Sequence, residues 1–130
     1  PELELVAFRN FMLRVAQKIA LKNDYKAIVT GDSLGQVASQ TIQNIAASDF
    51  GIEMPIFRPL IGYNKEEIIA LARYIGTYEE SIKPYKDCCS IIAKKPSTHA
   101  SKENLKVILE NAGFENIIDK TIFETAVFEN

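Results

Sequence analysis

Two adjacent cysteines, Cys88 and Cys89, are the only thiols of the chain and its clearest candidates for covalent chemistry. Neighbouring cysteines can close only a small, strained ring, so we expect free thiols and not a structural disulfide. Nearby cations lower the pKa of a thiol and raise the fraction of nucleophilic thiolate. The same irregular segment carries the lysines Lys83, Lys86, Lys94 and Lys95. The alternative is that both cysteines are small core residues, a common environment for free cysteine.

A zinc site at these cysteines is the weaker interpretation. The chain has one histidine, His99, which lies ten residues beyond Cys89. Two adjacent cysteines and one histidine do not make the set of four ligands that a structural zinc site needs. We therefore predict no metal site from the sequence and interpret His99 as a polar loop residue.

A second candidate site is the polar stretch TGDSLGQVASQT, which begins at Thr30 directly after an apolar run. Ligands of parallel sheets bind outside the carboxyl ends of the strands, where Gly31 is expected to lie. A glycine lets a ligand approach the backbone, and the N-terminus of a following helix presents free N–H groups. Helical spacing predicts that Ser33, Gln36 and Gln40 form one polar ridge beside it. The alternative is a tight turn with solvated glutamines, since the stretch is neither a Walker A loop nor a GxGxxG fingerprint.

Arg9 interrupts the apolar face of the expected first helix. It lies four residues after Leu5 and three before Met12, at the edge of the stripe that should be buried. One interpretation is a surface arginine whose apolar stem covers the core while its charge reaches water. The other is an arginine directed at a phosphate or at the polar edge of a nucleotide, to which the planar guanidinium is suited.

The elements that would position these residues alternate between helix and strand. Apolar spacing predicts a helix over 5–22 and then a strand, buried on both faces, over 26–30. Asp32 or Ser33 is expected to cap a helix that runs to about Ala47. The first helix should bury Leu5, Phe8, Met12, Val15, Ala16 and Ile19, with Asn10, Arg14, Gln17 and Lys18 on its polar face.

The second half of the chain continues this alternation before it becomes irregular. A strand is expected over 54–61, irregular because it contains two prolines. Asn64 and Glu67 are spaced as a capping box, which predicts a helix that stops at Gly76. Its inward residues are predicted to be Ile68, Ile69, Leu71, Ala72 and Ile75. The order helix, strand, helix, strand, helix indicates an α/β fold with parallel strands.

The remaining residues have a weaker pattern. Residues 77–98 show no sustained period, and long loops of this kind inside a domain are usually functional. Two terminal helices are expected over 101–111 and 117–128, joined by Gly113.

Composition and charge restrict the class of protein. The 130 residues include 15 Lys and Arg against 17 Asp and Glu, a net charge of −2, so there is no general basic surface for nucleic acid. An RNA partner would have to be held by a local patch or by parts of a longer protein. No apolar run approaches the roughly 20 residues that span a bilayer, and the first residues lack the basic start of a signal peptide. We expect a cytoplasmic protein with no membrane partner.

Three segments, in this order, resemble the tRNA 4-thiouridine synthases, the ThiI family, which is also linked to thiamine biosynthesis. They are AIVTGDSLGQVASQT, PIFRPLIGYNKEEIIALARYIGTYE and IKPYKDCCSIIAKKP. The resemblance implies an α/β fold of the PP-loop ATP pyrophosphatase type, a partial Rossmann-like parallel sheet with flanking helices. It also implies that ATP adenylates the carbonyl oxygen of a tRNA uridine. Sulfur from a cysteine persulfide, loaded by a cysteine desulfurase, would then replace that oxygen.

The resemblance also implies site residues. Gly31 and Gln40 match the family's glycine and glutamine that contact ATP, and Arg9 falls where the family has a basic ATP contact. Cys89 matches the catalytic cysteine, which would accept the sulfane sulfur or resolve the transfer by forming a disulfide, with Cys88 as its neighbour. ATP is expected to act with Mg²⁺ and tRNA to be the partner. One assembly consistent with the family is a homodimer of the full-length protein.

The chain also departs from the family. The SGG-type phosphate loop, the ferredoxin-like and THUMP regions, and the rhodanese domain of some members are not present. We therefore expect residues 1–130 to be the C-terminal part of the adenylating PP-loop domain, with the phosphate loop upstream.

Two other classes stay open. One is another PP-loop RNA-modifying enzyme, an amidotransferase or ligase, which would use ATP but transfer nitrogen. The other is a non-catalytic module whose cysteine pair binds an iron–sulfur cluster or a partner thiol.

Overall fold

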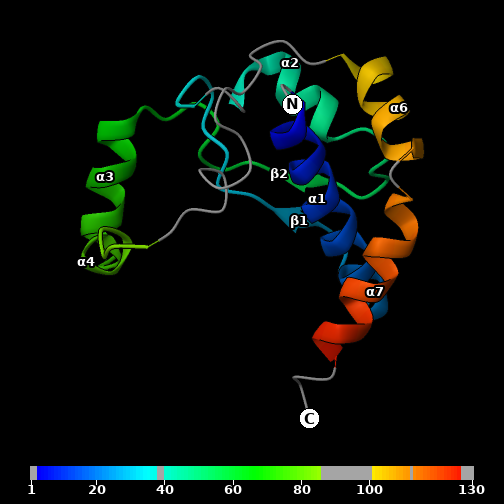
Figure 1. Cartoon of the computed structure of the whole chain (residues 1–130). Helices are drawn as coiled ribbons and strands as arrows, with labels where there is room; N and C mark the ends of the chain where they lie inside the picture. The colour runs from blue at the N-terminus through cyan, green and yellow to red at the C-terminus, as the bar shows by residue number, and fades with distance from the viewer. Residues whose placement is uncertain (1–2, 38–39, 86–100, 112, 127–130) are drawn as a thin grey trace.

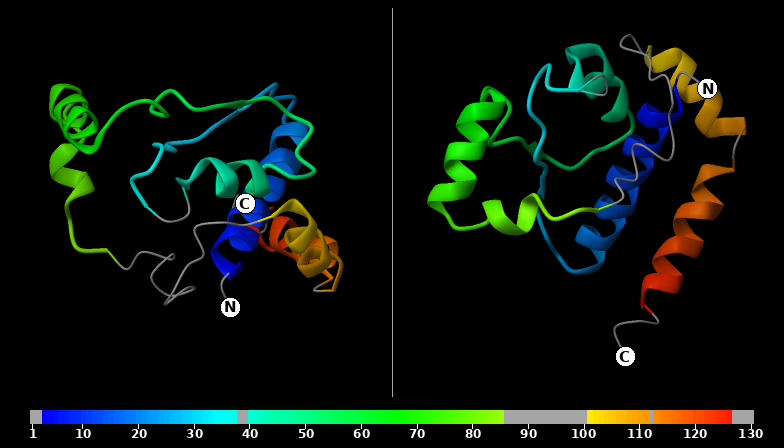
Figure 2. Two further views of the ribbon diagram at one scale, coloured as in Figure 1. Left: turned by 90° about the horizontal axis from the view of Figure 1, so that it is seen from above. Right: turned by 60° about the vertical axis from the view of Figure 1, so that its left-hand side comes forward.

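The computed structural model describes residues 3–37, 40–85, 101–111 and 113–126 (Figure 1). Its elements, in order, are α1 (Glu4–Lys22), β1 (Ile28–Val29), α2 (Ile42–Ser48), β2 (Ile56–Phe57), α3 (Lys65–Tyr74), α4 (Tyr78–Ser81), α6 (Lys102–Asn111) and α7 (Phe114–Ala126). Figures 1 and 2 show α3 and α4 on one side of the molecule and α6 and α7 on the other, with α1 and α2 between them. No helix within the described ranges is long and apolar enough to cross a membrane.

The two strands pair in parallel, as predicted, with Ile28 opposite Ile56 and Val29 opposite Phe57. Both are shorter than predicted, and β2 begins only at Ile56, directly after Pro55, because proline has no N–H for a ladder bond. The prediction that the first strand is buried on both faces is wrong. Ile28 is buried, whereas Val29 is 68% exposed, because α1 covers only one face of the sheet.

The first helix forms where predicted, and Leu5 is buried as expected, but the buried face is only partly the predicted one. Met12, predicted to point inward, is 41% exposed, whereas Asn10, predicted to be on the polar face, is fully buried. Asn10 Nδ2 donates to the carbonyl oxygens of Ser48 and Phe50, each at 2.8 Å. These carbonyls lie at the end of α2, where helix carbonyls lack partners within the helix. The bonds therefore satisfy both the buried amide of Asn10 and the two carbonyls. The apolar residues that α1 buries are Leu5, Val6, Ala7, Leu13 and Ala20.

The hydrophobic core lies where α1 and α2 meet the terminal helices. Its buried cluster consists of Val6, Ala7, Ala47, Leu105 and Leu109. Burial of a side chain such as Leu105, which is fully enclosed, contributes about 2 kcal/mol. The prediction of two terminal helices is confirmed, although α7 begins at Phe114, directly after Gly113, and not at 117.

The second helix begins much later than predicted, at Ile42 and not at Asp32 or Ser33. Thr41 caps it, since the Thr41 hydroxyl accepts the N–H of Asn44 at 3.2 Å. Upstream, Gly35 adopts a φ of +75°, which interrupts a right-handed helix. The predicted helical ridge of Ser33, Gln36 and Gln40 is therefore wrong.

The third helix confirms the capping box and contradicts the predicted burial. Asn64 accepts the N–H of Glu67 at 3.0 Å, and the Glu67 carboxylate accepts the N–H of Asn64 at 2.7 Å. Gly76, with a φ of +80°, ends the element as predicted. None of its predicted inward residues is buried, and Ile75 is 59% exposed. The reason is that, in the described part of the chain, α3 packs mainly against α4.

Gly51 provides a test of the packing between α1 and α2. Its φ is +75°, and an added Cβ would lie 2.5 Å from Arg14 Nη2. Arg14 cannot move freely, because it is bonded to Asn10, Glu115 and the carbonyl of Phe50. We expect Gly51→Ala to lower the free energy of unfolding by about 2 kcal/mol, measured by urea denaturation.

The matched control is Gly76→Ala. Gly76 has a similar positive φ but no described heavy atom within 4 Å of the Cβ position, so only the backbone cost of about 1 kcal/mol applies. Equal losses for the two variants would show that the Arg14 contact does not matter.

Candidate functional site

Asp32 is the centre of a buried network at the carboxyl end of β1. Its side chain is 4% exposed and accepts hydrogen bonds from three groups. Arg9 Nη2 donates to Oδ1. Thr30 Oγ1 and Arg58 Nε donate to Oδ2, at 2.8 Å and 2.9 Å. Both carboxylate oxygens are thus used inside the protein.

Arg58 extends the network to the end of α2. It directly follows β2, and its Nη2 pairs with Asp49 Oδ1 at 2.6 Å. Asp49 is the C-cap of α2, and Arg9 comes from α1. We call these four residues, Arg9, Asp32, Arg58 and Asp49, the Asp32 network. Its two positive and two negative charges alternate in space, so that each buried charge is paired.

The ionisation of Asp32 depends on this pairing. Burial is the largest single influence on its pKa and would raise it. The hydrogen bonds from Arg9, Thr30 and Arg58, together with the charge of Arg9, outweigh burial and hold the pKa of Asp32 below its ordinary value of 3.8. The carboxylate is therefore ionised at neutral pH.

The segment after Asp32 is a compact loop. Ser33 Oγ donates to the carbonyl of Tyr63 at 2.7 Å, and Leu34 N–H donates to the carbonyl of Ile61 at 3.1 Å. The loop closes on itself through Gly35 N–H, which donates to the carbonyl of Gln40 at 2.9 Å. These bonds fix the loop against the segment that follows β2.

The structure brings three predicted site residues to one place. Arg9 bonds Asp32, and the Gln40 side-chain oxygen accepts the N–H of Ser33 at 3.4 Å. Both therefore contact residues that directly follow Gly31. Gly31 is exposed, and no described heavy atom lies within 4 Å of the position where a Cβ would stand. The backbone there is open to close approach by a ligand.

The sequence reasoning missed most of the network that supports this place. Asp32 was predicted only as a helix cap, and Arg58 was given no role. A signal was present for Asp32, which follows the first strand of the predicted parallel pair, at the sheet edge where ligands bind. Arg58 gave no such signal, because it lay inside the second predicted strand, over 54–61, and follows that strand only in the structure.

The cysteine site lies outside the described residues. Cys88, Cys89, His99 and the three lysines 86, 94 and 95 all fall in the range 86–100. Lys83 is described and pairs with the exposed Glu80 at 2.7 Å. Within the described ranges, no three His, Cys, Asp or Glu side chains are grouped so that they could hold a metal ion.

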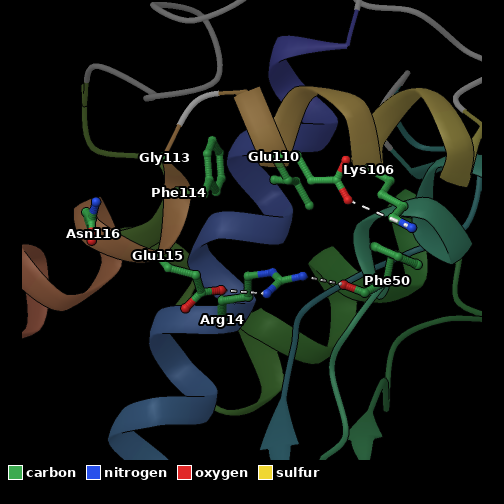
Figure 3. A pocket seen from close by; sticks show the side chains of 9 residues that line it. Arg14, Phe50, Lys106, Glu110, Gly113, Phe114, Glu115 and Asn116 are labelled. Atoms are coloured by element: carbon green, nitrogen blue, oxygen red, sulfur yellow. Dashed lines mark hydrogen bonds and ion pairs between the residues drawn. The ribbon is translucent and has the colours of Figure 1, made fainter.

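A separate hollow of about 300 Å³ lies between α1 and the junction of α6 and α7 (Figure 3). Arg14 projects into it and is bonded to Glu115 at 2.9 Å and to the carbonyl of Phe50 at 3.4 Å. Because these partners occupy the guanidinium, Arg14 acts there as a link between helices. The residues that line the hollow include none of the Asp32 network.

Comparisons with known proteins agree on one family. A family profile described as "Thiamine biosynthesis protein (ThiI)" matches residues 1–114. A "Probable tRNA sulfurtransferase" of Caldanaerobacter subterraneus subsp. tengcongensis is 44% identical over 128 residues, which cover 98% of this chain and 33% of the relative. A protein of the same name from Thermus thermophilus is 50% identical over 107 residues, covering 82% of this chain and 26% of the relative.

A solved structure extends the similarity to three dimensions. It is described as the crystal structure of a 4-thiouridine synthetase–RNA complex with bound ATP. It superimposes with a TM-score of 0.85 at 35% identity and covers 95% of this chain and 32% of that chain. The fold is thus a partial Rossmann-like α/β arrangement with a small parallel sheet. The chain spans about a third of the length of the relatives it matches.

The lowered pKa of Asp32 gives a prediction on stability and pH. An ionised Asp32 stabilises the fold above the ordinary carboxyl pKa of 3.8, and this contribution is lost as the pH falls through the lower folded-state value. We expect Asp32→Asn to lower the free energy of unfolding by about 3 kcal/mol near pH 7, because Arg9 loses its charged partner and Arg58 keeps only Asp49.

The difference between Asp32→Asn and the wild type should shrink below about pH 4, when measured by urea denaturation over a pH series. A difference that stays constant down to the acid limit of folding would contradict the assigned ionisation.

Proposed function

Because this chain belongs to the thiamine biosynthesis protein (ThiI) family, we propose that it is part of an ATP-dependent tRNA sulfurtransferase that forms 4-thiouridine. The main support is the similarity, over 95% of the chain, to a 4-thiouridine synthetase with bound ATP and RNA. Residues 1–130 would be the C-terminal part of the adenylating PP-loop domain. The phosphate-binding loop and the THUMP region would lie in another part of the intact protein.

The nucleotide would bind at the carboxyl edge of the sheet. The open backbone at Gly31 fits a ligand that must come close to the main chain. Gln40 and Arg9 border the same segment and would complete the adenosine side of the pocket. Bound ATP, together with Mg²⁺, would supply the AMP group that turns the uridine oxygen into a leaving group.

Cys89 would carry the sulfur chemistry, with Cys88 as its neighbour. In this scheme a persulfide sulfur forms a bond to the uridine carbon while the bond from that carbon to the AMP-bearing oxygen breaks. The second thiol then breaks the sulfur–sulfur bond, which releases thiouridine and leaves a disulfide between the two protein sulfurs. An external thiol reductant must return that disulfide to thiols before the next turnover.

The proposed partners follow from this chemistry. tRNA is the substrate, and a cysteine desulfurase is the source of the persulfide sulfur. The whole chain has a net charge of −2 and so offers no general basic surface that would hold RNA alone. The main grip on tRNA is therefore assigned to other parts of the intact protein, which we propose to be a homodimer.

The first test removes the sulfur-carrying thiol. In the intact protein, Cys89→Ser should lower 4-thiouridine formation at least about a hundredfold, because a hydroxyl cannot hold a persulfide. ATP-dependent adenylate formation should stay within about twofold of the wild type, since the ATP pocket is unchanged. Both quantities are measured on the same preparations, by nucleoside analysis of tRNA and by pyrophosphate release.

Cys88→Ser serves as the matched variant, one residue away with the same chemical change. We expect it to lose less thiolation than Cys89→Ser, because an external thiol can replace Cys88 in breaking the sulfur–sulfur bond, whereas nothing replaces the persulfide of Cys89. Normal thiolation by Cys89→Ser would remove this residue from the mechanism.

The second test concerns the nucleotide pocket. Gln40→Ala should weaken ATP binding about tenfold, the cost of one lost hydrogen bond and of a loosened loop. Gln43→Ala is the control, because Gln43 is an exposed residue of α2 with the same side chain. Calorimetric titration of the intact protein measures both affinities, and equal values for the two variants would argue against a pocket at Gln40.

A further inference from the structure

We propose that Asp32 is a positioning residue of the ATP site, acting through Arg9 and through the backbone at Gly31. This inference rests on the proposed function, because it takes Arg9 and Gly31 as ATP contacts. Asp32 itself is not a contact. Its side chain is 4% exposed, and both of its oxygens already accept hydrogen bonds from protein donors.

The first route runs through the Arg9 guanidinium. In the described part of the chain, the bond to Asp32 is the one hydrogen bond that the Arg9 side chain makes, and its Nε is buried without a partner. An arginine side chain has several rotatable bonds, and ordering it on ligand binding reduces affinity. The Asp32 carboxylate orders the guanidinium before the ligand arrives.

The second route runs through the backbone on both sides of Gly31. Thr30 Oγ1 donates to Asp32 Oδ2 at 2.8 Å, so a hydrogen bond joins the two residues that flank the glycine. Gly31 has no side chain of its own to hold it and would otherwise sample many backbone conformations. This bond restrains the segment that a nucleotide must approach.

The remainder of the network holds Asp32 in place. Arg58 donates to Asp32 at 2.9 Å and to Asp49 at 2.6 Å, which ties the end of β1 to the segment after β2 and to the end of α2. The Arg58 side chain is only 14% exposed, so solvent screens these pairs weakly. The position of the Asp32 carboxylate is thus fixed by the segment after β2 and by the end of α2.

The test is a double-mutant cycle on ATP affinity in the intact protein. Arg9→Gln and Asp32→Asn should each weaken ATP binding about tenfold, the cost of one hydrogen bond involving a charged group. If Asp32 acts largely through Arg9, the double variant should bind ATP about as weakly as either single variant. In the thiolation assay, Asp32→Asn should raise KM for ATP, with kcat at saturating ATP within about twofold of the wild type.

Thr30→Val provides a second variant that preserves the fold. It removes only the hydroxyl bond to Asp32 and keeps a β-branched residue beside the strand, and we expect it to weaken ATP binding about threefold. The matched control is Glu115→Gln, which removes an exposed carboxylate paired with Arg14, outside the Asp32 network. Its affinity for ATP should equal that of the wild type.

The outcomes separate four cases. Wild-type ATP affinity in both Asp32→Asn and Thr30→Val would overturn the positioning role while leaving the proposed function intact. A lowered Tm with an unchanged KM for ATP in Asp32→Asn would show a purely structural residue. Additive losses of ATP affinity in the cycle would show that Asp32 does not act through Arg9, and either result would also overturn the positioning role. Failure of the wild-type intact protein to bind ATP would overturn the proposed function itself.

Discussion

The structure depends on one buried carboxylate that must be paired. Asp32 is only 3% exposed, and an isolated charge at such a place would be strongly unfavourable. Its ionisation is made possible by Arg9 and Arg58, which lie 23 and 26 residues away in the sequence. The ion pairs of Asp32 hold α1 and the ends of both strands together at one edge of the sheet. The pair between Arg58 and Asp49 adds the end of α2. The place proposed for the nucleotide is therefore also the place where four elements are joined.

A second junction, at the same end of α2, is centred on the neutral side chain of Asn10. The buried amide of Asn10 satisfies two carbonyls at the end of α2, and Arg14 connects Asn10, Phe50 and Glu115. Together with the apolar cluster of α1, α2 and α6, this makes one well-packed half of the molecule. The other half is open, since Val29 and Phe57 on the far face of the sheet are 68% and 60% exposed. In Rossmann-like folds helices cover both faces of the sheet, and the described residues supply cover for one.

The site combines an open backbone with a charge that is already balanced. Gly31 leaves room for a ligand, whereas the guanidinium of Arg9 shares its charge with Asp32. In our proposal, Arg9 then acts less as a free cation than as a set of hydrogen-bond donors held in a fixed direction. Such preorganisation favours selective binding, because little ordering remains to be done when the ligand enters.

The sequence by itself determined the features that arise from neighbours in the chain. The span of α1, the capping box of α3, its stop at Gly76 and the parallel order of the strands follow from local periodicity, caps and glycines. Motif resemblance indicated the family and singled out Arg9, Gly31 and Gln40. Only the tertiary structure decided that Asn10 is buried, that α2 starts at Ile42, and that Arg58 and Asp49 support the site. These features depend on contacts between residues far apart in the sequence. The local pattern around a polar side chain does not reveal the distant hydrogen-bond or ion-pair partner that makes its burial favourable.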